Sequence, residues 1–134
     1  MLAFFPDGNP TPATPLGAAF LWWQALLNLD DYTSVLESLS SNPQDWGDYR
    51  AVVDTLQGWS IMQYVETCKD APDSIAYIKF MPDSGHPMRA FGTVPLDRVL
   101  VLTVEKCPDG FWRVWGLSEN YFPSAARVLY GTEE

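Results

Sequence analysis

The chain has few cysteines, few histidines and few basic side chains for its 134 residues, and each shortage excludes a class of protein. Its two cysteines, Cys68 and Cys107, are too few for a disulfide framework and lack the spacing of a zinc site. His86 is the only histidine, so we expect neither a metal nor a cofactor. Eight Lys and Arg stand against 17 Asp and Glu, and the net charge of −9 argues against nucleic acid and anionic membranes as partners.

Long apolar runs are also missing. No run reaches the length of a membrane span, and the first one ends at Pro6 without a basic segment before it. We therefore expect neither a transmembrane segment nor a secretory signal. The expected location is the cytoplasm, where the thiols stay reduced.

The apolar content that is present is enough for one folded domain. Hydrophobic residues make up 47% of the chain, with six Trp, six Tyr and seven Phe. We divide it into a proline-rich segment at 1–15, a domain at 16–122 and a tail at 123–134. The first cation is Arg50, so residues 1–49 predict a helical cover whose outer face is acidic.

Capping residues and helical spacing predict three amphipathic helices within the first 58 residues. Thr14 and Pro15 form the N-cap and first position of the first helix. Asp30 or Asp31 is the expected cap of the second. The third is expected to begin at the Asn-Pro pair that follows it and to end before Gly58, which suits a left-handed position.

After residue 58 the hydrophobic period changes to two, which predicts an antiparallel sheet. Its four strands are expected at 60–68, 74–81, 98–106 and 111–119. The sequence Cys-Pro-Asp-Gly at 107–110 is typical of a hairpin turn. The resulting register pairs Glu105 with Arg113 and Thr103 with Trp115.

Both faces of this sheet carry apolar side chains, so both need a cover. The helices can cover one face, and we expect a second copy of the chain to cover the other, which gives a homodimer. The register also separates Cys68 from Cys107 by two strand spacings, about 10 Å, which is beyond the reach of a disulfide.

Three segments carry a resemblance to a known family: AAFLWWQALL at 18–27, WGDYRAVV at 46–53 and GFWRVWGL at 110–117. In pattern and element order the chain resembles the superfamily of nuclear transport factor 2 (NTF2-like), which also contains ketosteroid isomerase, limonene epoxide hydrolase, scytalone dehydratase and SnoaL-type polyketide cyclases. The resemblance implies an α+β cone in which three N-terminal helices pack on a curved antiparallel sheet. Such folds serve enzymes, binding modules and assembly domains alike.

Enzymes of this superfamily place acid–base groups inside the cone, and four residues are candidates. Glu105 and Arg113 resemble a fragment of the Asp-Arg-Asp trio of the epoxide hydrolases, or else form a cross-strand ion pair worth about 0.2–1 kcal/mol. Glu66 is either a buried base or a rim residue in water. His86 lies in the long connection at 82–97, either in a lid over the pocket or in an exposed turn.

Aromatic residues suit a pocket better than the charged residues suit a mechanism. The rings of Trp22, Trp59, Tyr64 and Trp115 are expected to converge inside the cone, with Tyr32 as a fifth candidate, or else to fill the core. Converging rings would form an apolar pocket for a small, flat hydrophobic molecule.

Two hypotheses of function remain. The first is a ligand-binding domain, with or without cofactor-independent acid–base chemistry of the isomerase, cyclase, dehydratase or hydrolase type. The alternative is a non-catalytic dimeric adaptor or assembly domain that recognises protein partners. An open cavity with a buried carboxylate or histidine would favour the first, and a core closed by tryptophan rings would favour the second. Whether the protein is an enzyme stays open.

Overall fold

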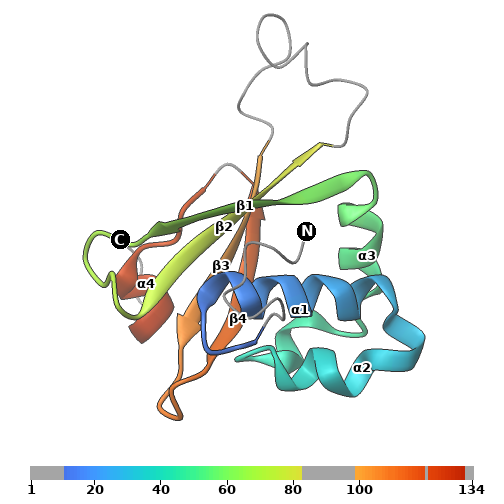
Figure 1. The fold of residues 1–134 in the computed structure, drawn as a ribbon, viewed down its shortest axis with the longest axis horizontal. Helices are drawn as coiled ribbons and strands as arrows, with labels where there is room; N and C mark the ends of the chain where they lie inside the picture. Colours follow the sequence, from blue (N-terminus) through green and yellow to red (C-terminus); the bar gives the residue numbers. More distant parts are fainter. Residues whose placement is uncertain (1–10, 83–98, 120, 132–134) are drawn as a thin grey trace, which may run out of the picture.

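The protein is an α+β structure in which helices pack on an open antiparallel sheet (Figure 1). The computed structural model describes residues 11–82, 99–119 and 121–131. The helices are α1 (Pro15–Leu27), α2 (Leu29–Ser38), the 3-10 helix η2 (Pro43–Trp46), α3 (Arg50–Leu56) and α4 (Ala125–Tyr130). The strands are β1 (Trp59–Thr67), β2 (Ile75–Pro82), β3 (Leu100–Lys106) and β4 (Trp112–Glu119).

Helix α1 begins where the sequence predicts. The Thr14 hydroxyl accepts a hydrogen bond of 3.0 Å from the backbone N–H of Gly17, and Pro15 occupies the first turn, where its missing N–H costs nothing. Both predicted features of this helix start are therefore confirmed.

A helix begins at the predicted Asn-Pro pair, since Asn42 is the N-cap of η2 and Pro43 its first residue, but the start predicted for the second helix is wrong. Asn28, not Asp30 or Asp31, is the N-cap of α2, and it makes no side-chain capping bond. The predicted third helix is interrupted because Gly47 and Tyr49 have φ angles of 65° and 67°, which no α-helix accommodates. A short 3-10 helix and the seven-residue α3 stand in its place.

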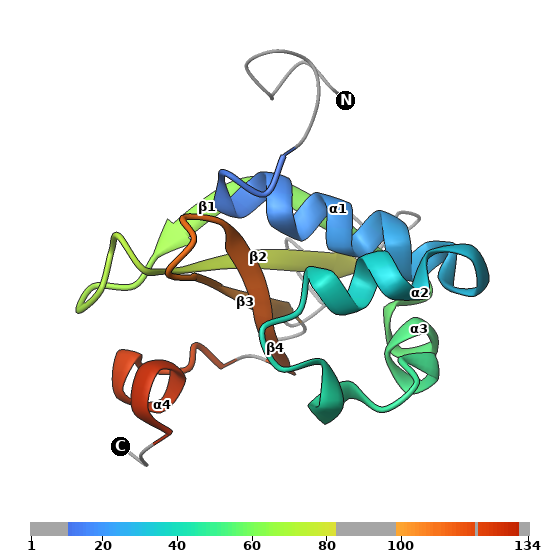
Figure 2. The ribbon, with the colours of Figure 1, turned by 90° about the horizontal axis from the view of Figure 1, so that it is seen from below.

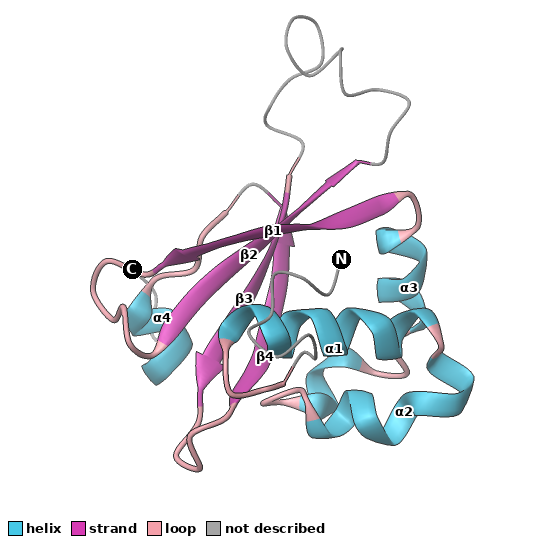
Figure 3. Cartoon of the chain, in the orientation of Figure 1, coloured by secondary structure: helices cyan, strands magenta, loops and turns pink. Residues whose placement is uncertain are grey.

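The sheet is a meander with the strand order β1-β2-β3-β4, and every neighbouring pair is antiparallel (Figure 3). The four predicted strands are confirmed to within two residues at each end. Residues 107–110 form the predicted turn between β3 and β4: the Gly110 N–H donates to the Cys107 carbonyl at 2.8 Å, and Gly110 has a φ of 89°.

A bulge changes the predicted register of the last hairpin. Glu105 pairs with Arg113 as expected, but Thr103 pairs with Gly116, so the predicted pairing of Thr103 with Trp115 is wrong. Trp115 is the extra residue between the two halves of the β3–β4 ladder.

Two hydrophobic clusters lie on opposite faces of the sheet. The larger cluster joins α1, α2 and α3 to one face, and the smaller one joins Ile75, Tyr77 and Val101 to Val128 of α4. Figure 2 shows α1 on one side of the strands and α4 on the other. Helix α4 thus covers part of the face for which we expected a second copy of the chain.

Backbone contacts protect the outer edge of β4. The Trp112 N–H donates to the Pro12 carbonyl at 2.8 Å, and the Val114 N–H donates to the Leu39 carbonyl at 2.8 Å. The Val114 carbonyl in turn accepts from the Ser41 N–H at 2.9 Å. These bonds occupy donors and acceptors that an open edge would offer to another strand.

Cys68 is buried, Cys107 is half-buried and both are free thiols, as predicted. Within the described ranges, each helix is too short or too polar to cross a lipid bilayer.

Gly17 provides a test of how the segment before α1 packs. A Cβ atom at this position would overlap the Thr11 carbonyl oxygen and lie 2.9 Å from the Thr11 nitrogen. We expect Gly17→Ala to lower the free energy of unfolding by about 1–3 kcal/mol despite the higher helix propensity of alanine, measured by urea denaturation. Gly116→Ala is the control, because a Cβ there would meet no atom within 4 Å. Equal effects of the two substitutions would contradict this packing.

Candidate functional site

An apolar groove lies between α1 and α2. It has a volume of about 480 Å³. Its lining residues come from both helices and their junction: Leu21, Gln24, Ala25, Leu27, Asn28, Tyr32 and Val35. The two helices lie side by side in both Figure 1 and Figure 2.

The junction of the two helices shapes the groove. Asn28 ends α1 with φ −125° and ψ 46°, and α2 begins at the next residue. The Asn28 side chain donates a hydrogen bond of 3.0 Å to the Gln24 carbonyl of the preceding turn. Tyr32 has non-helical backbone angles and marks a kink in α2. The sharp connection and the kink therefore determine the relative orientation of the two helices that form the walls of the groove.

Large apolar side chains line the walls of the groove and remain in contact with solvent. The exposed fractions are 53% for Leu27, 48% for Tyr32 and 41% for Val35, whereas Ala25 is buried at the floor. Side chains of this type gain free energy when a partner covers them, at about 25 cal/mol per Å² of apolar surface.

The surroundings of the groove are acidic. Asp30 and Asp31 lie in the first turn of α2, and both are exposed. The Arg50 guanidinium forms an ion pair with Asp30 at 2.7 Å, with both side chains largely in water. Since residues 1–49 contain six Asp and Glu but no Lys or Arg, nearby positive charge comes from beyond this part of the sequence.

Beneath the groove the interior is closed around the Ser40 hydroxyl. Its oxygen accepts a hydrogen bond from Trp22 Nε1 at 3.1 Å and donates one to the Leu36 carbonyl at 2.8 Å. The Tyr49 hydroxyl lies 3.1 Å from the same oxygen. Because the single Ser40 proton goes to Leu36, Tyr49 is the donor in the third bond. Ser40 thus uses its full hydrogen-bonding capacity.

Aromatic packing completes this closed interior. The Trp22 side chain is fully buried, and its ring lies 5.2 Å from that of Trp46. Trp46 stacks on Tyr49 with centroids 6.0 Å apart and an interplanar angle of 14°. Burial raises the pKa of the Tyr49 phenol above its ordinary value, and the Glu37 carboxylate adds to this rise.

The five predicted ligand-binding residues do not share one cavity. Trp22 and Trp59 belong to the cluster on the helical side of the sheet, while Trp115 packs in the cluster on the opposite face. Tyr64 is 58% exposed on β1. The expected convergence of these rings is wrong because strand alternation and the bulge direct them to different faces. Tyr32 lies instead in the α1–α2 groove.

Glu66, a predicted base, lies at the surface of the sheet. Its carboxylate forms an ion pair with Lys79 on the neighbouring strand at 3.2 Å, and the Glu66 side chain is 42% exposed. The Lys79 ammonium also lies 5.4 Å from the centre of the Phe122 ring. These contacts link β1 and β2 to the segment before α4, and they match the alternative of a rim residue in water.

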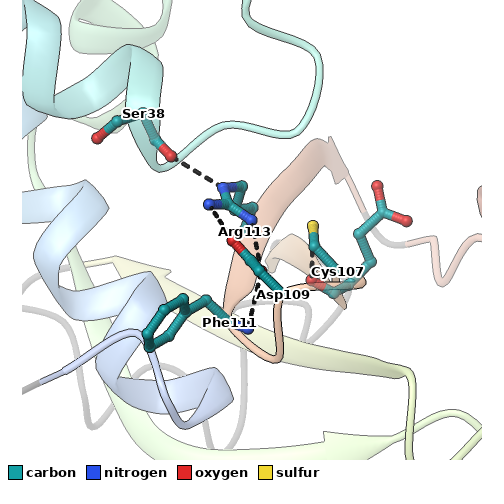
Figure 4. A network of polar contacts seen from close by, with 6 residues as sticks. Ser38, Cys107, Asp109, Phe111 and Arg113 are labelled. Atoms are coloured by element: carbon teal, nitrogen blue, oxygen red, sulfur yellow. Dashed lines mark hydrogen bonds and ion pairs between the residues drawn. The ribbon is translucent and has the colours of Figure 1, made fainter.

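Arg113 contacts Asp109 through its guanidinium, and not the predicted partner Glu105 (Figure 4). Nη1 and Nη2 of the guanidinium donate to Oδ1 and Oδ2 of Asp109 at 3.1 and 2.8 Å. The third nitrogen, Nε, donates to the Ser38 carbonyl at 3.0 Å. Asp109 also accepts from the Phe111 N–H at 3.0 Å. The bidentate pair fixes the β3–β4 turn and ties it to the end of α2.

Among the described residues the buried hydroxyls belong to Ser40, Thr103, Tyr49 and Tyr77, and no Asp, Glu, Lys or Arg is buried. His86, the remaining predicted catalytic residue, lies outside the described ranges. Within these ranges, no three His, Cys, Asp or Glu side chains gather closely enough to hold a metal ion.

The α4 side of the sheet offers a second, smaller hollow. It has a volume of about 130 Å³ and lies between β4 and the segment leading into α4, with Trp115 and Arg127 in its lining. Close by, the Tyr77 hydroxyl donates a hydrogen bond of 2.5 Å to the Pro123 carbonyl. Burial, followed by the neighbouring Cys68 thiol, raises the pKa of the Tyr77 phenol. This phenol therefore fixes the approach to α4 and is not an acid or base near neutral pH.

Sequence reasoning missed the α1–α2 groove. A signal was present: Leu27 and Val35 fall outside the buried stripes of their helices, where surface helices usually carry polar side chains. Comparisons with protein-family models, curated proteins and solved structures find no significant match to this chain.

The Arg113 guanidinium, with the Phe111 N–H, lowers the pKa of the Asp109 carboxyl to about 2. The ordinary pKa of this group is about 3.9. The ion pair therefore stabilises the folded state fully above about pH 4, and this stabilisation is lost as the pH falls toward 2. We expect the difference in free energy of unfolding between the wild type and Asp109→Asn to become smaller as the pH falls from about 4 to about 2. A difference independent of pH would contradict the pairing, and carbon NMR of the carboxyl gives its pKa directly.

The Ser40 contacts make a separate prediction about stability. Ser40→Ala leaves Trp22 Nε1 and the Tyr49 hydroxyl buried without their shared acceptor, at about 1–3 kcal/mol for each group. We expect a loss of about 2–4 kcal/mol in the free energy of unfolding, measured by urea denaturation. Ser38→Ala is the control because that hydroxyl bonds only the Val35 carbonyl at an exposed site. Similar losses in both variants would contradict the account.

Proposed function

We propose that this chain is a non-catalytic protein-interaction domain whose recognition surface is the α1–α2 groove. The observation that carries the proposal is the contrast between a closed interior and an open apolar groove. On the inside, the fully buried Trp22 ring is bonded to Ser40 and packed against Trp46. On the outside, Leu27 and Val35 remain exposed.

The positions of the ionisable side chains support a binding role over acid–base chemistry. Among the described residues no Asp, Glu, Lys or Arg is buried. The hydroxyls that are buried belong to Ser40, Thr103, Tyr49 and Tyr77, and none of them ionises near neutral pH, since burial raises the pKa of both phenols. Glu66 is paired with Lys79 at the surface, and Arg113 is held by Asp109 at a turn. A general acid or base works from a protected position within reach of its substrate, which these groups do not occupy.

We propose further that the fold is of the NTF2-like type. The element order supports this proposal, because helices precede an antiparallel meander and pack on one of its faces. The superfamily includes non-catalytic assembly and transport domains, so the fold accommodates a binding function.

Selection from a phage-displayed library of random peptides tests the function without assuming a partner. We expect peptides that bind the wild type and lose at least about tenfold in affinity on Val35→Asp, because a buried, unpaired carboxylate would enter the apolar contact. Leu129→Asp on α4 is the matched control: both residues are 41% exposed, and the control should bind as the wild type does. Affinity is measured by fluorescence polarisation.

Two results would contradict the proposed function. One is the absence of any selected peptide whose binding responds to Val35→Asp while that variant remains folded by circular dichroism. The other is a small hydrophobic molecule that raises the melting temperature and whose site, mapped by NMR, lies in the interior near Trp22.

A further inference from the structure

We infer that the partner segment recognised by the α1–α2 groove is a basic amphipathic helix. This inference rests on the proposed function and adds the conformation and the charge of the partner. Two independent features of the groove carry it: the hydrogen-bonding state of its walls and the charge around it.

The walls of the groove favour a helical partner over an extended one. A peptide that binds as a strand needs a row of open backbone donors and acceptors. Both walls of this groove are α-helices, and at their junction the carbonyls of Gln24, Ala25 and Asn28 accept hydrogen bonds from the side chain or backbone of residues 28–32, so the groove offers mainly side chains. The partner must therefore satisfy its own backbone groups while it presents apolar side chains, and an amphipathic helix does both.

The arrangement of the apolar groups fits this mode. Leu27 lies at the end of α1, and Tyr32 and Val35 project from α2, so the exposed anchors stand on both walls above the buried Ala25. A helix can insert side chains spaced at i, i+3, i+4 and i+7 into such a groove. The amide groups of Gln24 and Asn28 at its lining add polar contacts at the edge.

The charge around the groove selects a basic partner. Asp31 adjoins Tyr32 at the kink of α2, and Asp30 in the same turn already engages Arg50. With a net charge of −9 for the whole chain, an acidic segment would be repelled on approach, whereas Lys or Arg flanking an apolar stripe would be attracted.

The peptides selected against the wild type also test this inference. We expect them to carry a net positive charge and a helical apolar pattern, to gain helicity on binding by circular dichroism, and to bind at least about fivefold more weakly when NaCl rises from about 50 mM to about 500 mM. Asp31→Lys should weaken binding by a similar factor, and a peptide with its Lys and Arg changed to Glu should bind this variant better than the wild type does. Asp73→Lys, in the exposed β1–β2 turn, is the charge control and should weaken binding less than Asp31→Lys.

The outcomes separate this inference from the proposed function. Peptides that respond to Val35→Asp but are neutral, acidic, extended or insensitive to salt would overturn the basic helix and leave the protein-interaction role in place. If Asp31→Lys and Asp73→Lys weaken binding equally, the charge acts through the whole molecule and not at the groove, which also overturns the inference. The absence of any groove-dependent peptide contradicts the proposed function itself.

Discussion

The rest of the structure depends on the junction at residues 39–41, where helices and sheet meet. The Ser40 hydroxyl is hydrogen-bonded to three helical segments: to Trp22 of α1, to the Leu36 carbonyl of α2 and to Tyr49 at the start of α3. The backbone on either side of Ser40 bonds Val114 of β4. One hydroxyl and a short stretch of main chain therefore position three helices against the edge of the sheet. A buried hydroxyl with three partners is stabilising only while every partner is present, so this junction tolerates little change.

This junction also determines how the helices pack over the sheet. Among the described residues, the bonded indole of Trp22 and the larger hydrophobic cluster fill the space where α1 packs on the sheet. On the outer surface of α1 and α2, the apolar side chains of Leu27, Tyr32 and Val35 stay exposed. The groove of about 480 Å³ with acidic surroundings is the surface that we propose for a partner. The closed core and the open groove are two consequences of the same packing.

The sequence predicts the features that arise from local rules. Thr14 starts a helix through its side-chain hydroxyl and Pro15 through its fixed φ, and Gly110 permits the hairpin turn because it adopts a positive φ. The remaining features depend on contacts between distant residues. No pattern in the sequence indicates the bulge at Trp115 or the left-handed conformation of Tyr49. Each exists because tertiary packing outweighs the local backbone preference. The groove was not predicted from the sequence for the same reason, since it forms only when α1 packs against α2.

The most direct test of a closed core with an outer groove is a nitrogen NMR titration of the labelled protein with a selected peptide. The account predicts shifts confined to backbone amides lining the groove, from Leu21 to Val35, with the Trp22 indole N–H signal unmoved in its bond to Ser40. Perturbation of that indole signal together with amides of the inner sheet face would show that the ligand enters the core, and would contradict the account.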